Sequence, residues 1–158
     1  MALRKCYFYA FNTQSMNPSS SAITVQITLP TTPERAWDYF TAPAHITQWY
    51  FASDDWHAPA AQNDLRAGGR FSIRMEAKDG SFGFDFEGEY SQVMPPEVLA
   101  YGMSDGRQVN TRLKSTSEGV VLTQTFDPET VNPLEMQREG WQMILNNLKK
   151  YVERAEAL

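Results

Sequence analysis

The residues best suited to chemistry in this sequence are its two histidines and the polar side chains near them. His57 follows Asp54 and Asp55, and imidazole and carboxylate groups together can bind a metal ion. No cysteine and no helical pair of histidines supports such a site, so the sequence predicts no metal. His45 stands near the start of a predicted short helix, where we expect it to be exposed. Ser53 is nearby in sequence, but no triad can be read from this spacing.

Two further motifs are better explained by structure than by catalysis. Arg74, Asp85 and Glu87 are a candidate polar cluster, but alternation places them opposite the neighbouring phenylalanines. We therefore predict cross-strand ion pairs on the solvent face of a sheet. The pair Gly68-Gly69 lacks the spacing and the Lys-Ser/Thr of a phosphate-binding loop, and a predicted strand follows it. It is interpreted as a strand entry or bulge.

The elements that position these residues begin with an amphipathic helix at the C-terminal end. Asn132 is expected to cap this helix, with Pro133 at its first position and Glu135 completing a capping-box-like start. The large apolar residues then recur at helical spacing and form one stripe: Leu134, Trp141, Ile144, Leu145, Leu148, Tyr151 and Val152. Such a helix requires an apolar surface to pack against.

Alternating apolar residues predict that this surface is an antiparallel sheet. Residues 22–29 form the first predicted strand, and two short helices follow it after Pro33 and Pro43. Residues 53–64 are predicted as a polar loop, and five more strands follow between residues 71 and 126. Asp79-Gly80 is predicted to centre a hairpin turn that sets Arg74 near Asp85 and Met75 near Phe84. The fold class is thus α+β, with about six strands around one long helix.

Length and composition indicate one domain over residues 22–158, after a flexible N-terminal extension at residues 1–21. The chain has 158 residues with 42% hydrophobic and 21% charged, which is an ordinary globular composition. Met16 is interpreted as the natural start, which would place residues 1–15 outside the native protein. The net charge of −5 argues against nucleic acid or an anionic membrane as the main partner.

Two observations bear on the location of the protein. No run approaches the roughly 20 apolar residues that a membrane span needs. Cys6 is the one cysteine, so no intrachain disulfide can form and a reducing, cytoplasmic location is the simpler interpretation.

Several segments, taken in order, carry a resemblance to a known family. The segments are Pro33-Glu34-Arg35-Ala36-Trp37, Trp49-Tyr50, Leu65-Arg66-Ala67-Gly68-Gly69-Arg70-Phe71, Gly88-Glu89-Tyr90, Pro95-Pro96-Glu97-Val98-Leu99-Ala100-Tyr101 and Gly140-Trp141. With the element order, they resemble the helix-grip fold of the Bet v 1-like, START-related (SRPBCC) superfamily. The resemblance is closer to the branch that contains the C-terminal domain of the activator of the Hsp90 ATPase. It covers about residues 22–152 and implies a curved sheet that grips the long helix.

A helix gripped by a single sheet often encloses a cavity, and we predict a ligand site there. Residues predicted to line it, or to fill it as ordinary core, are Trp49, Phe71, Ile73, Phe84, Phe86, Tyr101, Trp141 and Leu145. Polar groups expected to orient a ligand are Tyr101, Thr111 and Gln142. No cofactor is predicted.

Three functions remain open from the sequence. The first is binding of a hydrophobic or amphipathic small molecule in the cavity. The second, implied by the resemblance, is a stress-linked co-chaperone-like domain that contacts a chaperone; no counterpart of the activator's first domain is recognised, so ATPase stimulation is not expected. The third is a cyclase- or hydrolase-like enzyme, with Tyr101 and Asp85 as candidate residues, although no strong catalytic constellation supports it. The sequence allows a monomer or a homodimer formed through a sheet edge or a helix.

Overall fold

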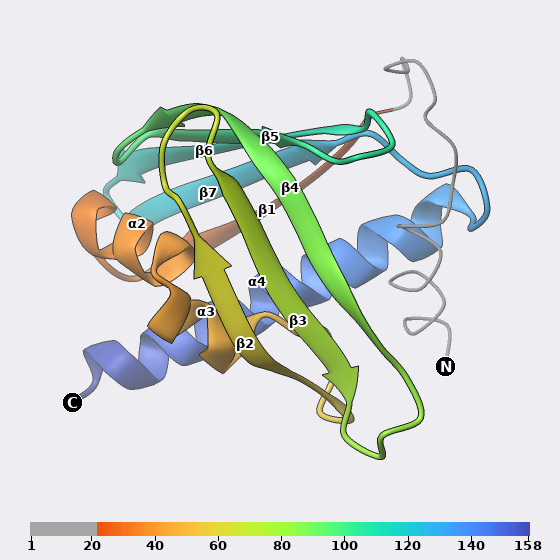
Figure 1. Cartoon of the computed structure of the whole chain (residues 1–158). Coiled ribbons are helices and arrows are strands. Elements are labelled where there is room, and N and C mark those ends of the chain that lie inside the picture. Colours follow the sequence, from red (N-terminus) through yellow and green to blue (C-terminus); the bar gives the residue numbers. More distant parts are fainter. Residues whose placement is uncertain (1–21) are drawn as a thin grey trace.

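The computed structural model describes residues 22–158 (Figure 1), so the predictions for the extension at residues 1–21 lie outside the described residues. The elements in chain order are β1 (Ile23–Leu29), α2 (Pro33–Thr41), α3 (Pro43–Trp49), β2 (Trp56–Asn63), β3 (Arg70–Ala77), β4 (Gly83–Met94), β5 (Val98–Gly102), β6 (Gln108–Thr116), β7 (Gly119–Phe126) and α4 (Leu134–Glu156). All strand pairs are antiparallel, in the order β1-β7-β6-β5-β4-β3-β2. The sheet curls around α4, and α2 and α3 lie beside α4 on the same side of the sheet (Figure 1). The predicted α+β helix-grip fold is confirmed.

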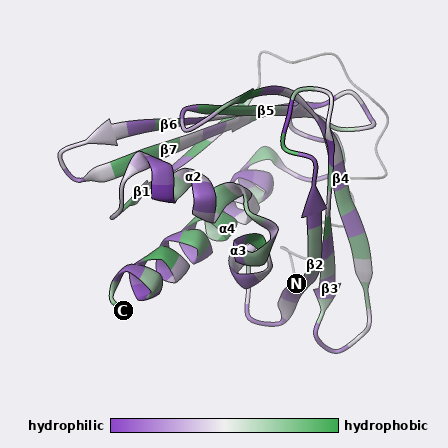
Figure 2. Ribbon diagram, turned by 60° about the vertical axis from the view of Figure 1, so that its left-hand side comes forward, coloured by the Kyte–Doolittle hydropathy of each residue, from purple (hydrophilic) through white to green (hydrophobic). Residues whose placement is uncertain are grey.

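Apolar residues alternate along the strands and form a stripe along α4, which explains where the core lies (Figure 2). The stripe of α4 buries Ile144, Leu145, Leu148 and Val152 against the sheet and its neighbouring helices. Burying one such side chain contributes roughly 1.5–3 kcal/mol. The long helix is therefore held mainly by its apolar face.

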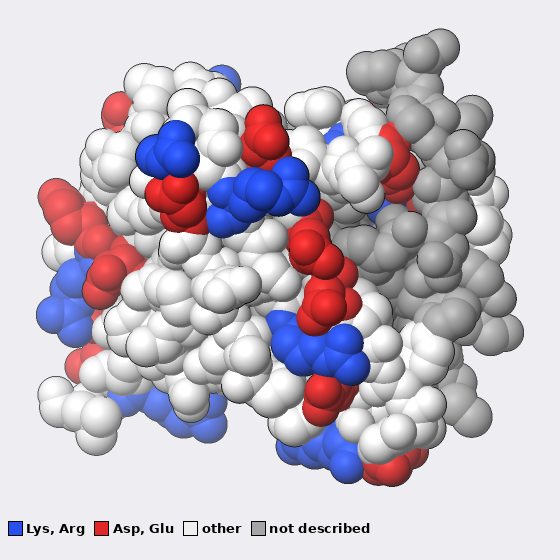
Figure 3. All heavy atoms as spheres, viewed as in Figure 1, with Lys and Arg blue, Asp and Glu red and all other residues white. Residues whose placement is uncertain are grey.

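The hairpin between β3 and β4 has the register that the sequence predicts. Arg74 pairs with Asp85 and Met75 pairs with Phe84 across the two strands. Gly80 has φ +77°, the left-handed conformation that suits glycine in the predicted Asp-Gly turn. The Arg74 guanidinium lies 3.5 Å from the Asp85 carboxylate on the outer face, where basic and acidic side chains intermingle (Figure 3). The predicted surface ion pair is thus present.

The prediction of a loop at residues 53–64 is wrong over most of its length, because Trp56–Asn63 forms an additional strand, β2. This strand brings the sheet to seven strands. This edge strand pairs with β3 through its backbone, and its register shifts between His57 and Ala60. The sequence around Pro59 is rich in alanine and polar residues, so it lacks the alternation that marks the other strands. Backbone pairing to a neighbour, which composition does not reveal, builds this strand.

The start of α4 also differs from the prediction. Pro133 occupies the N-cap position, and no side chain caps the helix. Instead, the Glu129 carboxylate accepts backbone N–H bonds from Val131 and Asn132 at 3.2 and 2.7 Å. The Gln137 amide donates to the carbonyl oxygens of Glu129 and Asn132. A buried network one turn into the helix therefore organises the preceding loop, in place of the expected Asn132 cap.

Both edges of the sheet carry features that limit free backbone groups. At β1, Arg138 Nη1 and Gln142 Nε2 of α4 donate to the carbonyl oxygens of Thr24 and Gln26, each at 2.9 Å. Gln142 is thus bound at the edge of the sheet, whereas the sequence suggested that it orients a ligand. At β2, Pro59 has no N–H to offer. None of the helices formed by residues 22–158 has the length and apolarity that a membrane crossing requires.

Candidate functional site

A cavity of about 30 Å³ lies between the sheet and the helices α2 and α3. This volume has room for about one or two water molecules. The residues that line it come from α2, the α3 region and four strands: Phe40, Ile46, Tyr50, Phe71, Ile73, Phe86, Tyr90, Leu99, Tyr101 and Gln124. The wall opposite the sheet is therefore built by the two short helices.

Four of the residues predicted from the sequence meet at this cavity, namely Phe71, Ile73, Phe86 and Tyr101. They lie on β3, β4 and β5, whose alternation turns these positions inward. The Phe71 ring contacts the Tyr101 ring edge-on, with centroids 4.7 Å apart, and lies 5.6 Å from the Phe86 ring. Such tilted contacts suit aromatic quadrupoles and leave little free space.

Two of the other predicted residues, both tryptophans, pack beside the cavity without lining it. Trp49 is fully buried, stacks on Phe40 and donates from Nε1 to the Tyr39 carbonyl oxygen at 2.9 Å. Trp141 stacks on Phe126, with centroids 3.9 Å apart and an interplanar angle of 10°. The Trp141 and Phe86 ring centroids are 6.4 Å apart in an edge-on arrangement, so Trp141 packs against one lining residue.

The remaining two predicted residues are farther from the cavity lining. Phe84 packs against Trp56, with centroids 6.0 Å apart. Leu145 is buried in the apolar stripe of α4. The eight residues thus form one continuous core in which four line the cavity.

Polar lining groups are the part of the site that sequence reasoning largely missed. Tyr50 and Tyr90 join the predicted Tyr101, and Gln124 adds an amide. The Tyr50 and Tyr101 phenols both line the cavity and interact with each other. Asn63 Nδ2 donates to the Tyr90 hydroxyl oxygen at 3.3 Å. Tyr90 and Tyr101 lie on strands at buried positions, and Tyr50 directly follows α3, so only the three-dimensional grouping reveals a shared polar role.

The environment of these phenols keeps them neutral. Burial raises the pKa of Tyr101 well above its ordinary value, and the neighbouring Tyr50 hydroxyl adds to the shift. Burial also raises the pKa values of Tyr50 and Tyr90. The three hydroxyls therefore stay protonated at neutral pH and can donate hydrogen bonds.

Gln124 is held by a buried hydrogen bond. Its Nε2 donates to Thr111 Oγ1 at 3.1 Å, and both residues are almost fully buried. Thr111, which the sequence suggested as an orienting group, therefore acts by fixing the amide of a lining residue.

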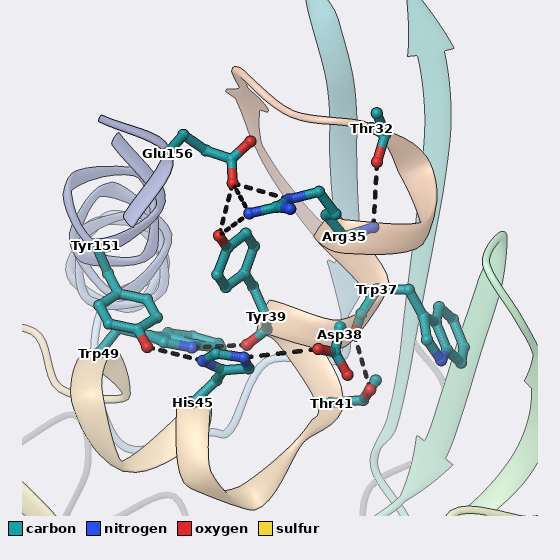
Figure 4. Close-up of polar contacts among 10 residues, drawn as sticks. All are labelled: Thr32, Arg35, Trp37, Asp38, Tyr39, Thr41, His45, Trp49, Tyr151 and Glu156. Carbon is teal, nitrogen blue, oxygen red and sulfur yellow. Dashed lines mark hydrogen bonds and ion pairs between the residues drawn. The ribbon is translucent and has the colours of Figure 1, made fainter. Parts of the chain in front are cut away.

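A second polar cluster joins α2, α3 and the end of α4, and we call it the helix clasp: Arg35, Asp38, Tyr39, His45, Tyr151 and Glu156 (Figure 4), together with Thr31 just before α2. At its centre, Glu156 accepts hydrogen bonds from Tyr39 at 2.7 Å, from Thr31 at 2.9 Å and from Arg35 Nε at 2.9 Å. The hydrogen bond from Tyr39 is the main cause that holds the pKa of Glu156 below its usual value, followed by those from Thr31 and Arg35. Around Glu156, the clasp is thus an ionic contact between Arg35 and Glu156 at the surface.

His45 belongs to this clasp and is not the exposed residue that the sequence predicts. Its Nδ1 lies 2.7 Å from the Tyr151 hydroxyl, and 30% of its side chain is exposed. Its Nε2 lies 3.6 Å from an Asp38 carboxylate oxygen, which is too long for a hydrogen bond. The order carboxylate, imidazole, hydroxyl resembles a hydrolytic triad, but the long contact and the exposed Asp38 favour a structural role.

No group of three or more His, Cys, Asp or Glu side chains within residues 22–158 is arranged to hold a metal ion. His57 instead lies 3.5 Å from Glu76 on the outer face. Gly68 and Gly69 also have structural roles, since Gly68 has φ +85° and a Cβ at Gly69 would overlap the Asp64 carbonyl oxygen. The interpretation of this pair as a strand entry is confirmed.

Comparison with known proteins agrees with the geometry. The family described as "activator of Hsp90 ATPase homolog 1-like protein" matches residues 30–153. The solution structure of an AHSA1-like protein from Aeromonas hydrophila shares 40% identity, with a TM-score of 0.81 over 87% of this chain and 95% of that one. A Cytophaga hutchinsonii protein shares 47% identity, with a TM-score of 0.73 over 85% and 94% of the two chains.

A protein from Nitrosomonas europaea is 19% identical to this chain, with a TM-score of 0.74 over 87% of this chain and 97% of that one. At this identity the likeness is one of fold alone. No curated protein sequence matches this chain at a significant level.

Proposed function

This chain belongs to the activator of Hsp90 ATPase homolog 1-like family, and from that premise we propose that it binds a hydrophobic small molecule between its sheet and its helices. The observation that carries the proposal is the cavity, where aromatic side chains surround a few neutral polar groups. Apolar walls with a small number of placed hydrogen-bonding groups are typical of small-molecule sites. Side chains without polar atoms are preferred where a core serves stability alone, so three phenols around one void are better explained by a binding role.

The bound ligand must enlarge the cavity, because 30 Å³ is far below the several hundred Å³ of common ligand sites. Phe40 and Ile46 form the helical part of the wall, and Tyr50 follows α3 directly. A shift of these short helices, or a rotamer change of the aromatic rings, would widen the space without breaking the sheet. We therefore expect the ligand to select a more open conformation than the one described.

Native mass spectrometry of freshly purified full-length protein tests this function. We expect a non-covalent adduct that disappears on denaturation, and its mass would give the class of ligand. The variant L99F enlarges a lining residue and should reduce adduct retention. The matched variant L113F enlarges a buried residue of β6 that does not line the cavity, so its adduct should persist. Bare protein, together with no binding from a panel of lipids, sterols and polyketides, would refute the proposal.

A second candidate function, contact with a chaperone, is favoured by the description of the family. We propose it as an alternative whose test is direct. Full-length protein immobilised on a resin should retain a purified Hsp90-type chaperone above the level of a resin that carries an unrelated acidic protein. Absence of retention, with and without nucleotide, would remove this alternative.

The enzymatic alternative gains no support from the two residues suggested for it. Tyr101 is buried at the cavity, whereas half of the Asp85 side chain is exposed on the outer face beside Arg74. The two side chains lie on opposite faces of the sheet and do not share one site.

A cytoplasmic location remains a proposal that rests on the single cysteine, Cys6. Fractionation of cells that express the native gene would test it, and recovery from a secreted fraction would contradict it.

A further inference from the structure

We propose that the ligand of this cavity is a neutral, largely apolar molecule that carries a hydrogen-bond acceptor oxygen, such as a ketone, ester or ether. The inference rests on the proposed binding function and specifies its chemistry. It follows from a count of hydroxyl hydrogens and from the charge of the lining.

The Tyr90 hydroxyl supplies the first free hydrogen-bond donor. Its oxygen accepts a hydrogen bond from Asn63, so its own hydrogen remains to be donated. Tyr90 is almost fully buried, and no residue within 22–158 accepts this hydrogen. A buried donor without an acceptor is unfavourable, so an acceptor in the cavity is favoured.

The Tyr50 and Tyr101 pair supplies a second donor. Both phenols line the cavity, and a hydrogen bond between them uses at most one of their two hydroxyl hydrogens, so at least one remains. Tyr90 lines the same cavity, and its phenol interacts electrostatically with the other two. Two hydroxyl hydrogens are thus available in one region of the cavity, which suits an oxygen with two lone pairs.

We expect the acceptor to be neutral because the described lining of the cavity carries no charge. None of the described residues that line the cavity carries a charge. The cation that acts electrostatically on Tyr101 is Arg107, whose guanidinium is already paired with Asp105 at 2.8 Å. A carboxylate placed among these groups would lose its hydration without gaining a free cation, and this is strongly unfavourable.

Three small probes of nearly the same shape test the inference on the full-length protein. They are α-methylstyrene, which has no acceptor oxygen, acetophenone, in which a carbonyl replaces the alkene, and benzoate, which is an anion. NMR titration of isotope-labelled protein gives the affinity of each probe and identifies the residues that it perturbs. The variants Y90F and Y50F each remove one hydroxyl, and thermal unfolding confirms that they are folded.

We expect acetophenone to bind three- to tenfold more weakly to Y90F and to Y50F than to the parent protein, because one neutral hydrogen bond is worth about 0.5–1.5 kcal/mol. The affinity of α-methylstyrene should stay the same or increase in these variants. The matched control Y151F, whose hydroxyl bonds His45 outside the cavity, should leave both affinities within about twofold. Benzoate should bind at least about tenfold more weakly than acetophenone.

The outcomes separate the inference from the function beneath it. If α-methylstyrene and acetophenone bind at the cavity but both tyrosine variants leave the acetophenone affinity unchanged, the acceptor inference is wrong while the cavity function stands. Tighter binding of benzoate than of acetophenone also overturns the inference. If none of the probes perturbs the cavity residues at millimolar concentration, the binding function fails and the ligand class fails with it.

Discussion

The cavity and the helix clasp both depend on tyrosine hydroxyls, but they use them in opposite ways. Around the cavity, Tyr50 and Tyr101 are desolvated and lie among neutral groups. In the clasp, Tyr39 donates to the carboxylate of Glu156 at the surface, next to Arg35. The comparison shows that the partner, not the residue type, decides whether a tyrosine hydroxyl lies among neutral groups or anchors a carboxylate. It also implies that acid acts on the clasp through Glu156, whereas alkali acts on the cavity phenols and, because burial raises the pKa of Tyr39 too, on part of the clasp.

The largest effect is expected where the two regions meet, at Trp49. Its ring stacks on Phe40 of the cavity wall, and its Nε1 bonds the carbonyl oxygen of Tyr39 in the clasp helix. W49A should reduce the free energy of unfolding by about 4 kcal/mol, because it removes a fully buried indole. Urea denaturation measures this loss. W49F keeps a ring and should lose distinctly less; equal losses would mean that the hydrogen bond outweighs the packing.

Alkali should act on the cavity. The raised pKa of Tyr101 means that its stabilising contribution is complete below the unfolded value of about 10 and is lost as the pH rises further. At pH 11 one such group costs about 1.4 kcal/mol, so Y101F should weaken the alkaline loss of stability by about that amount. Chemical denaturation between pH 8 and pH 11 measures it. An alkaline profile that Y101F leaves unchanged would show that the phenol is not desolvated.

Acid should act on the clasp. Because the pKa of Glu156 is lowered, its contribution is present above the unfolded value of about 4.3 and is lost as the pH falls through the folded value. E156Q should cost about 1 kcal/mol at pH 7 and progressively less in acid, since the contact is partly exposed. Urea denaturation from pH 7 to pH 3 tests this.

The control for the clasp is E153Q. Glu153 lies one helical turn before Glu156, is exposed, and has no ion pair among residues 22–158. E153Q should leave the acid profile close to that of the parent protein. Equal effects of E156Q and E153Q would indicate a general charge effect on the helix instead of a specific clasp.

The smallest effect is expected on the outer face of the sheet, far from both regions. R74Q removes the cross-strand contact with Asp85, but exposed ion pairs add little to stability. We expect the melting temperature to change by less than about 2 °C. Differential scanning calorimetry measures it, and a larger shift would mean that the network of Arg74 with Glu76 has a greater role than its exposure suggests.

Local pattern was sufficient to predict much of the fold. Alternation and the Asp-Gly turn fix the β3–β4 register, because a slip of one residue would turn Phe86 outward and Asp85 inward. The same alternation identifies four lining residues of the cavity. In contrast, the sequence does not predict β2. Its pairing with β3 is made by backbone groups, and its alanine-rich and polar residues show no strand pattern.

The clasp and the phenol group could not be predicted, because their partners are distant in sequence. Tyr39 and Glu156 are separated by 117 positions, and His45 and Tyr151 by 106. The partial burial of His45 depends on where the last turns of α4 lie, which no local window of sequence contains. Tyr50 and Tyr90 each satisfy the pattern of ordinary core, so their hydrogen-bonding role appears only once the chain is folded.

The contacts of Arg138 and Gln142 with the β1 backbone also restrict how the protein can associate. Their donors occupy the carbonyl oxygens that an added strand would need, and the proline and register shift of β2 disfavour the same process at the opposite edge. A second copy therefore cannot readily prolong the sheet, and neither can an extended peptide. Any homodimer or chaperone complex must be formed through side-chain surfaces, which would make assembly sensitive to point substitutions and resistant to amyloid-like growth.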